Sequence, residues 1–487
     1  MNEPKENKFI DWRTTKRERI SYYIGDNAKT LEGVLIQTFM TTFLLLSGVN
    51  LMAVATVTFI VKIIDALDDV IFGYLVDKLK PSQIRLIVKL GGNGKYLPWY
   101  RATFWIFPLV TVMLFQMPQG MGEWAKVAYF AVFYLLYDLT YTIIDIPMNS
   151  AIMTITDNPI ERNAIVTNKN IITMIMSLLA APLMFFLITE NVGMSVKNVV
   201  LLMSVIFVVL MLPLVFVTKE HNVNATVDEE DRYSLKDMLV GLKNNKYLLL
   251  LLAITMIHGC FLTGDSIGLF VSYYLYGNSS ILLIPALISI IPALVAQKVS
   301  EVLCKKYEVF RVCLFVQIIH LIFRIVIFII GYGNIVVHIT LLILVGIPSI
   351  MFFMATQYMI LDCIEYGQYK SGMECAGISF ALKSFVNKVT PSVASSLGLI
   401  VLGFFGWVSI QAESFAEIAE KNITQPASAL TGLWIVNAGL IIIGVALSVV
   451  LLFFYRLKKS DVEVMIRVNK GEMSRDEAQA QLSHSYY

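Results

Sequence analysis

Charged residues are scarce in this chain. Asp, Glu, Lys and Arg make up only 15% of its 487 residues, whereas hydrophobic residues make up 57%. Soluble globular proteins carry about 25% charged residues, so this chain has too little charge to cover a surface that faces water. The shortage excludes nearly every soluble enzyme.

Cysteine pairs and catalytic motifs are also missing. The five cysteines form no CxxC or CxxxC pair, which argues against a zinc site and a disulfide framework. The basic segment 1–21 has no apolar core, so we do not expect it to act as a signal peptide. No nucleophile with its base is visible, and the net charge of +2 indicates no nucleic-acid partner. We expect neither an enzyme nor a cofactor beyond a transported ion.

Long apolar blocks dominate the sequence instead. Each is about as long as a helix that crosses a bilayer core of ~30 Å. Hydropathy and turn signals predict twelve such spans, at 28–48, 52–76, 98–117, 124–151, 165–189, 198–217, 247–275, 279–299, 309–331, 335–360, 376–407 and 430–455. The sequence therefore predicts an all-α membrane protein with twelve transmembrane helices in two six-helix bundles.

The charged stretch between the sixth and seventh spans divides the chain. We expect an N-terminal bundle at 1–218, a cytoplasmic linker at 219–246, a C-terminal bundle at 247–455 and a cytoplasmic tail at 456–487. With these bounds, 26 of the 38 Lys and Arg residues fall on the tails and alternate loops of one side, and only Lys197 and Lys421 fall on the opposite loops. Because basic loops stay in the cytoplasm, both termini are predicted to be cytoplasmic.

The second span concentrates charge inside the membrane, where ionisable residues are functional candidates. Lys62, Asp65 and Asp69 lie at i, i+3 and i+7, on one helix face, and Asp68 lies beside them. Carboxylates one turn apart repel each other unless a cation or a proton lies between them. The pattern favours a cation or proton site. In the alternative, Lys62 forms a structural ion pair with one of the acids.

The fourth span places a second carboxylate on a polar face. Tyr141, Thr142 and Asp145 repeat at helical spacing, so hydroxyls and a carboxylate share a face that predicts a binding site. In the alternative, the neighbouring hydroxyls merely hold Asp145. Asp138 is interpreted as part of a contact between two helices.

The eleventh span contains two lysines. We expect Lys388, deep in an apolar helix, to pair with the aspartates of the second span, because an unpaired lysine there would prefer to be neutral. Lys383 lies about 140° around the helix from it, at ~100° per residue, and either faces the cavity or extends to the cytoplasm.

Several longer motifs occur in series along the whole chain. They are DALDDVIFGYLVD, GKYLPW, YTIIDIPMNS, TDNPIERN, SLKDMLVGLKNNKYLLLL, DCIEYGQYKSGMECAG and FVNKVTPSVASSLG, and GYLVDKLK at 73–80 resembles the GxxxD(R/K) signature of the major facilitator superfamily. In order and spacing the motifs resemble the glycoside-pentoside-hexuronide:cation symporters, the melibiose permease group. The resemblance implies the major facilitator fold and a sugar carried with Na+ or H+.

The resemblance also assigns the cation site. It implies that Asp65, Asp69 and Thr142 bind the ion, as Na+ ligands if the transporter is sodium-coupled, and that Lys388 competes for the same charge. Asp68 is an additional carboxylate that favours proton chemistry or changes the choice of cation. Asp145 corresponds to the carboxylate that links sugar and cation.

The sugar side departs from the melibiose permease pattern. Where those symporters have Lys followed by Asp on the first helix, this chain has Lys29 and Thr30. Asn149 stands at a tryptophan position, Asn170 at an arginine position beside Lys169, and Phe353 represents an aromatic residue of the tenth helix. A glycoside is therefore implied, but not a galactoside in particular.

These observations predict a sugar symporter that works by alternating access in the plasma membrane, the inner membrane of a bacterium, as a monomer. The substrate is either a neutral glycoside or pentoside, or an acidic glycoside attracted by Lys29, Lys169 and Lys383. In the alternative, Lys29 only pairs with Asp26 or Glu32, and Lys169 and Lys383 reach the cytoplasm. A lysolipid or other amphiphile carrier on the same fold is the alternative function, and a channel is a third.

Overall fold

Helices are the regular secondary structure of the residues that the structure describes. The computed structural model describes residues 12–78, 84–92, 94–221, 245–372 and 376–483, and no strand occurs among them. They divide into two compact units. Unit 1 comprises residues 1–229 and 409–423, and unit 2 comprises residues 230–408 and 424–487.

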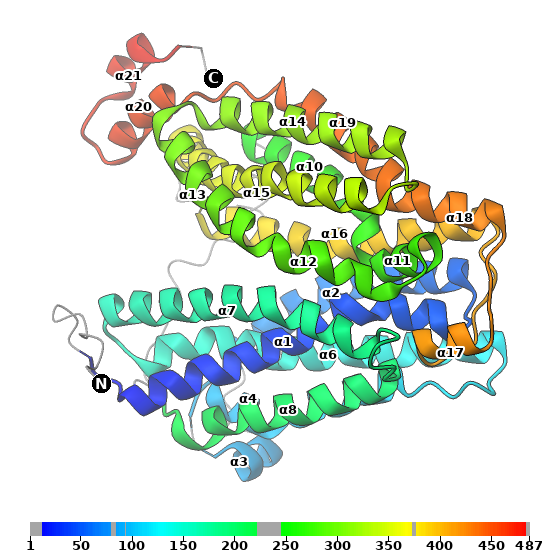
Figure 1. Cartoon of the computed structure of the whole chain (residues 1–487). Helices are drawn as coiled ribbons and strands as arrows, with labels where there is room; N and C mark the ends of the chain where they lie inside the picture. Colours follow the sequence, from blue (N-terminus) through cyan, green and yellow to red (C-terminus); the bar gives the residue numbers. More distant parts are fainter. Residues whose placement is uncertain (1–11, 79–83, 93, 222–244, 373–375, 484–487) are drawn as a thin grey trace, which may run out of the picture. The chain divides into compact units, whose positions relative to one another are not determined.

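Unit 1 contains the helices of the first half of the chain (Figure 1). Its helices are α1 (Lys16–Leu46), α2 (Leu51–Lys78), α3 (Arg85–Gly91), α4 (Leu97–Thr103), α5 (Ile106–Phe115), α6 (Glu123–Ile155), α7 (Pro159–Ile188), α8 (Val196–Val217) and α17 (Phe415–Glu420). Within the unit, α1 packs against α7 and α8, and α2 packs against α6. This arrangement brings the charged residues of α1, α2, α6 and α7 into the interior of one bundle.

Unit 2 contains the helices of the second half. They are α10 (Lys246–Cys260), η3 (Thr263–Ser266), α11 (Gly268–Tyr276), η4 (Ser279–Leu282), α12 (Leu283–Ile288), α13 (Ile290–Lys306), α14 (Val309–Ile330), α15 (Ile335–Ser371), α16 (Ala376–Phe404), α18 (Ala427–Trp434), η5 (Ile435–Gly439), α19 (Leu440–Leu452), α20 (Lys459–Asn469) and α21 (Arg475–Gln481). Helix α15 packs against α13 and α14, and α10 packs against α16 and α19.

The predicted all-α membrane fold is confirmed. Among the described residues, eight helical segments are long and apolar enough to cross a bilayer, and three shorter apolar helices begin at Leu51, Ile106 and Lys246. Helix α1 is in neither group although it has 31 residues. Its interior carries Asp26, Lys29 and Glu32, which lower its hydropathy, so the most polar spanning helix is the one that carries candidate site residues.

Several predicted spans are broken in ways that an apolar pattern does not reveal. The span predicted at 98–117 is divided between α4 and α5, and the span at 247–275 is divided among α10, η3 and α11. The last span contains the π-helical turn η5, which disturbs the regular hydrogen-bond ladder. The Thr263 hydroxyl donates to the Val436 carbonyl at 2.6 Å, so the carbonyl of this turn keeps a partner.

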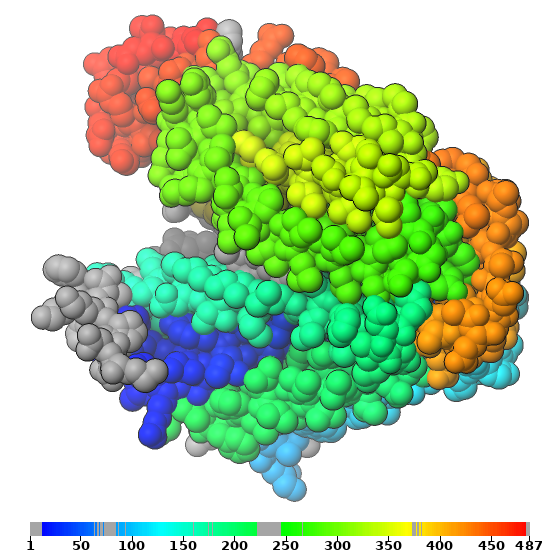
Figure 2. Space-filling model, viewed as in Figure 1, coloured from blue at the N-terminus to red at the C-terminus, as the bar shows by residue number. Residues whose placement is uncertain are grey.

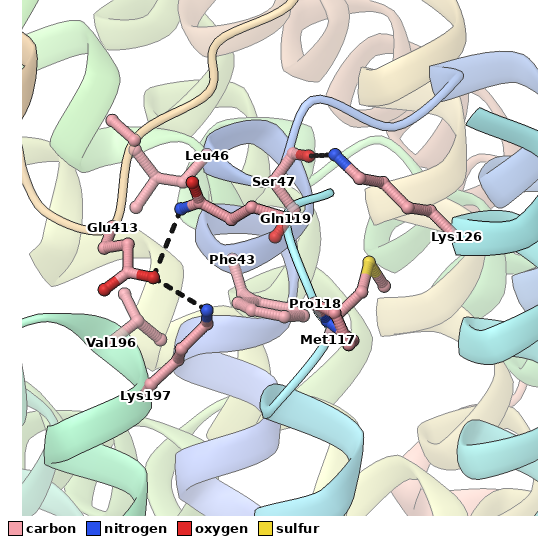
Figure 3. Close-up of a pocket in the computed structure, with 11 residues that line it drawn as sticks. Phe43, Leu46, Ser47, Met117, Pro118, Gln119, Lys126, Val196, Lys197 and Glu413 are labelled. Atoms are coloured by element: carbon pink, nitrogen blue, oxygen red, sulfur yellow. Dashed lines mark hydrogen bonds and ion pairs between the residues drawn. The ribbon is translucent and has the colours of Figure 1, made fainter. Parts of the chain in front are cut away.

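Residues Ser409–Ile423 follow α16 in sequence but belong to unit 1. The Ala412 N–H donates to the Leu46 carbonyl, and the Val196 N–H donates to the Glu413 carbonyl, each at 3.1 Å. Figure 3 shows the Glu413 carboxylate between Gln119 and Lys197, with Oε1 3.2 Å from Gln119 Nε2 and 2.8 Å from Lys197 Nζ. Unit 1 is therefore assembled from two separate stretches of the sequence.

Glu220 organises the GKYLPW motif in unit 1. Its carboxylate accepts from the N–H groups of Lys95 (2.7 Å) and Tyr96 (2.9 Å) and from the Thr154 hydroxyl (2.6 Å). Gly94 has a φ of +147°, and a Cβ added there would collide with Glu220 Oε2. This glycine-rich segment therefore wraps around a carboxylate of its own chain.

The Glu161 carboxylate organises the TDNPIERN motif in the same way, by accepting several hydrogen bonds. It accepts from the N–H groups of Arg13 (3.1 Å) and Thr14 (3.0 Å), from the Thr14 hydroxyl and from the Thr156 hydroxyl (2.7 Å). These bonds attach the segment before α1 to the start of α7. The motif has a structural role at this end of unit 1.

Candidate functional site

A ladder of alternating charges crosses the interior of unit 1. Lys29 Nζ on α1 lies 2.5 Å from Asp145 Oδ1 on α6 and 3.3 Å from Asp26 Oδ1 on its own helix. The other oxygen of Asp26 lies 3.2 Å from Lys169 Nζ on α7. The ladder joins three helices with two ammonium groups and two carboxylates, so its charges balance.

Asp145 is the residue of this ladder whose side chain reaches an accessible surface. Its side chain is 21% exposed, whereas those of Lys29 and Asp26 are almost completely buried. Its Oδ2 accepts from Asn149 Nδ2 at 3.0 Å, one turn further along α6, and Asn149 is exposed. The pair therefore presents a carboxylate and an amide side by side, which together accept and donate hydrogen bonds.

An aromatic column runs along α6 toward this pair. The rings of Phe130, Tyr134, Tyr137 and Tyr141 stack successively, with centroids 5.1, 6.4 and 6.3 Å apart. Phe107 on α5 packs against the last two rings, at 5.3 and 5.6 Å. Tyr141 thus ends an apolar column one turn before Asp145.

A second charge cluster joins α2 to α6. Lys62 Nζ lies 2.8 Å from Asp138 Oδ1 and 3.3 Å from Asp65 Oδ2, and both carboxylates are buried. The ammonium also lies 5.5 Å from the centre of the Tyr134 ring. Thr142 is buried one turn after Asp138. Lys62 is therefore in contact with two carboxylates, so Lys62, Asp65 and Asp138 together carry a net negative charge when all three are ionised.

Comparison with known proteins decides the family. The family model described as MFS/sugar transport protein matches residues 21–459. The chain belongs to this family.

Two curated relatives agree with this assignment. The chain is 23% identical to an isoprimeverose transporter of Lactiplantibacillus pentosus over 92% of this chain and 90% of the relative. It is 22% identical to a glucuronide carrier protein homolog of Escherichia coli (strain K12) over 84% of this chain and 87% of the relative. This member of the MFS/sugar transport protein family is a membrane transporter and not an enzyme.

A solved structure shows the same fold. A bacterial homolog of the human lysosomal transporter Spinster, in an inward-facing and occupied conformation, matches with a TM-score of 0.60 at 11% identity, over 94% of this chain and 98% of that one. Together with the match to the MFS/sugar transport protein model, this similarity confirms the predicted major facilitator fold.

The other predicted substrate residues of this MFS/sugar transport protein belong partly to unit 1 and partly to unit 2. The Thr30 hydroxyl donates to the Asp26 carbonyl of its own helix at 3.0 Å instead of joining the ladder. Asn170 is exposed on α7 beside Lys169. In unit 2, Lys383 donates to the Gln357 side chain, and Phe353 is 53% exposed on α15.

The predicted cation residues are described to different extents. Asp65 and Asp68 lie on α2, and the Asp69 side chain lies outside the described residues. Lys388 is partly buried on α16 in unit 2. Its pairing with the aspartates remains a prediction.

Sequence reasoning assigned no site role to two groups of polar residues in this transporter. Asp26 was expected only as an alternative ion-pair partner of Lys29, and it contacts both lysines of the ladder. In unit 2, Gln317 lies 2.9 Å from His258 Nδ1 and donates to Ser448 Oγ at 2.6 Å, joining α10, α14 and α19. The spacing between Asp26 and Lys29 was a usable signal, whereas nothing in the local sequence pairs Gln317 with His258.

Proposed function

We propose that this chain is a sugar symporter that couples uptake of a neutral glycoside or pentoside to the entry of a cation. The observation that carries the proposal is the Asp145–Asn149 pair, held by Lys29 and open to an accessible surface. Sugar hydroxyls both donate and accept hydrogen bonds, so a carboxylate beside an amide suits them. The sugars named for the relatives favour this substrate class over an amphiphile.

The balanced ladder favours a neutral sugar over an acidic one. Lys29 and Lys169 are the cations that would attract a uronide, but both already contact Asp26 or Asp145. Binding an anion would require one of these ion pairs to separate, at the cost of leaving a carboxylate buried without its partner. Lys383, the third lysine of the acidic-substrate hypothesis, donates to Gln357.

The α2–α6 cluster is the proposed cation site. A Na+ ion or a proton would bind beside the Lys62 ammonium at the carboxylates of Asp65 and Asp138, with Asp69 and Thr142 as further ligands. Na+ is favoured over H+ because carboxylate and hydroxyl oxygens are hard ligands that suit a hard ion. The surplus of negative charge around Lys62 supports the binding of one more cation.

The proposed transporter lies in the plasma membrane with both termini in the cytoplasm. It alternates its access to the two sides by movement of two bundles about a site near the middle of the membrane. When the cation site is empty, the uncompensated acids make crossing costly, because charge inside a bilayer is expensive. This cost links sugar movement to cation movement.

The decisive experiment is uptake into membrane vesicles with imposed Na+ or H+ gradients. Neutral glycosides and pentosides are compared with uronides, and lysolipids are added as competitors. Accumulation of a neutral sugar that depends on the Na+ gradient supports the proposal. Accumulation that continues when choline replaces Na+ at fixed pH reverses the choice of ion, and inhibition by lysolipids with no uptake of any sugar would overturn the substrate class.

A further inference from the structure

An apolar groove with a basic mouth lies on unit 2. It has a volume of about 670 Å³ and is lined by α14 and α15, by the end of α13 and by the first residue of α20. Figure 1 shows α13, α14 and α15 side by side, and Figure 2 shows the yellow-green surface of α15 uncovered between α13 and α14. All of its lining residues belong to unit 2.

The mouth of the groove carries unpaired positive charge. Lys306 ends α13, Arg311 lies in the first turn of α14, and neither has a carboxylate partner within ion-pair distance among the described residues. Lys459 is already engaged, since its N–H donates to Glu308 Oε2 at 2.7 Å and its Nζ donates to the Lys305 carbonyl at 3.1 Å. Lys306 and Arg311 are thus free to bind an anion.

The floor of the groove is apolar and has a defined length. Arg311, Phe315, Ile319 and Phe323 follow one another at intervals of four residues, so they form one ridge along α14. Twelve residues at ~1.5 Å each extend about 18 Å. One leaflet of a bilayer core is about 15 Å thick, half of ~30 Å. The ridge therefore begins at a charged helix end and continues for about the depth of a single leaflet.

We propose that this groove binds an anionic phospholipid, with its phosphate between Lys306 and Arg311 and an acyl chain along the α14 ridge against α15. Both cations lie at the adjoining ends of α13 and α14, and the apolar helical segments Ser279–Lys306 and Val309–Ile330 that contain these helices are long enough to cross a bilayer, so headgroups are expected at this level. Tyr307 between them is 51% exposed, and aromatic residues of this kind are enriched at the membrane interface. Basic pockets between transmembrane helices are suited to anionic headgroups.

The bound lipid would also stabilise the C-terminal tail. Lys459 is the first residue of α20, and Asn469 at its other end donates to the carbonyl (3.0 Å) and the carboxylate (2.9 Å) of Glu365 on α15. A phosphate at the mouth adds negative charge beside Lys459, at the start of the tail. Headgroup binding and docking of the tail on α15 are therefore expected to support each other.

The test measures lipid binding to the purified full chain in neutral detergent. Phosphatidylglycerol is titrated against phosphatidylcholine with the same acyl chains, and Tm and the lipids retained in native mass spectrometry are recorded. Lys306→Gln/Arg311→Gln is compared with Lys298→Gln/Lys305→Gln, which removes the same charge from exposed lysines that pair with Glu301 instead. Each basic residue near an anionic surface contributes about 1 kcal/mol, so the first variant is expected to bind phosphatidylglycerol about 30-fold more weakly.

Two further arms identify what the groove recognises. Ile319→Trp changes no charge but fills the groove, and it is expected to weaken phosphatidylglycerol binding while leaving the apparent fold unchanged by circular dichroism. Glycerol 3-phosphate, a headgroup without acyl chains, is expected to produce no Tm shift at concentrations where the lipid does. Equal shifts with both lipids, or equal loss in the two double variants, would overturn the proposal.

Discussion

At the scale of single residues, the ladder of unit 1 makes Asp145 the residue on which sugar binding depends. Asp145→Asn keeps the size of the side chain but removes one of the two carboxylates that contact Lys29. We expect sugar uptake to fall by about 10²-fold or more, because Lys29 becomes a buried cation with one partner fewer and the sugar loses a charged acceptor. Asp157→Asn, the same change at an exposed carboxylate, is the control and should leave uptake unchanged.

Substitutions in the proposed cation site are expected to change transport differently from Asp145→Asn. Asp65→Asn or Asp69→Asn is expected to abolish accumulation driven by a gradient while sugar exchange between equal concentrations continues, because the cation loses a charged ligand but the sugar site remains. Uptake and exchange are measured in the same vesicles. Full accumulation by both variants would remove these aspartates from the cation site.

Burial of the Glu32 side chain lowers the stability of the fold. Its side chain is completely buried in α1, and neither carboxylate oxygen has a hydrogen-bond partner among the described residues. The nearby Thr111 hydroxyl donates instead to the Phe107 carbonyl at 3.0 Å. Glu32→Leu should therefore raise the free energy of unfolding by about 1–3 kcal/mol, seen as a higher Tm in detergent. Glu32→Gln keeps a buried polar group, so its Tm should rise less than that of Glu32→Leu. A larger rise for Glu32→Gln would contradict this explanation.

At the scale of elements, Glu220 fixes the loop that leads into α4. Gly94→Ala adds a Cβ at a φ of +147° and drives it into Glu220, so a loss of about 1–3 kcal/mol is expected. Gly120→Ala is the control, because a Cβ there contacts nothing within 4 Å and the glycine has no positive φ. A similar Tm for the two variants would show that the loop adjusts freely.

The start of α1 should show a dependence on pH. Burial acts to raise the pKa of Glu18, but hydrogen bonds from the backbone and hydroxyl of Thr15 and the contact with His221 outweigh it, so the pKa lies below its ordinary value near 4.5. A lowered pKa contributes stability above the unfolded-state value, and that stability is lost as the pH falls through the folded-state value. The Tm difference between the wild type and Glu18→Gln should therefore shrink as the pH falls below about 4.5. A constant difference would exclude this linkage.

The elements were largely predictable, whereas their interruptions and their partners were not. Each of the twelve predicted spans coincides with helix, because the length of an apolar block is recorded in the local sequence. The break before Ile106 and the π-helical turn at Ile435–Gly439 both occur inside predicted spans, where the overall hydropathy does not mark them. Likewise, spacing identified Lys62 and Asp65 as neighbours on one face, but the contact of Lys62 with Asp138 depends on how α2 packs against α6.

At the scale of the whole molecule, the orientation in the membrane is open to a direct test. Lys421→Cys and Lys470→Cys are matched changes at exposed lysines, one in the segment after α17 and one after α20. In a background without native cysteines, a maleimide that does not cross membranes should label the first in intact cells and the second only after permeabilisation. The reverse pattern would place both termini outside the cytoplasm.

Because Ser409–Ile423 belong to unit 1, the transporter should be sensitive to expression as two separate polypeptides. A polypeptide that ends after His221 would leave the Leu46 carbonyl and the Val196 N–H without the backbone partners that this segment supplies. The complementary polypeptide carries that segment between α16 and α18. Split halves of the gene should therefore yield an N-terminal fragment that is unstable when expressed alone and recovers on co-expression, with the segment itself acting as the recognition element for reassembly.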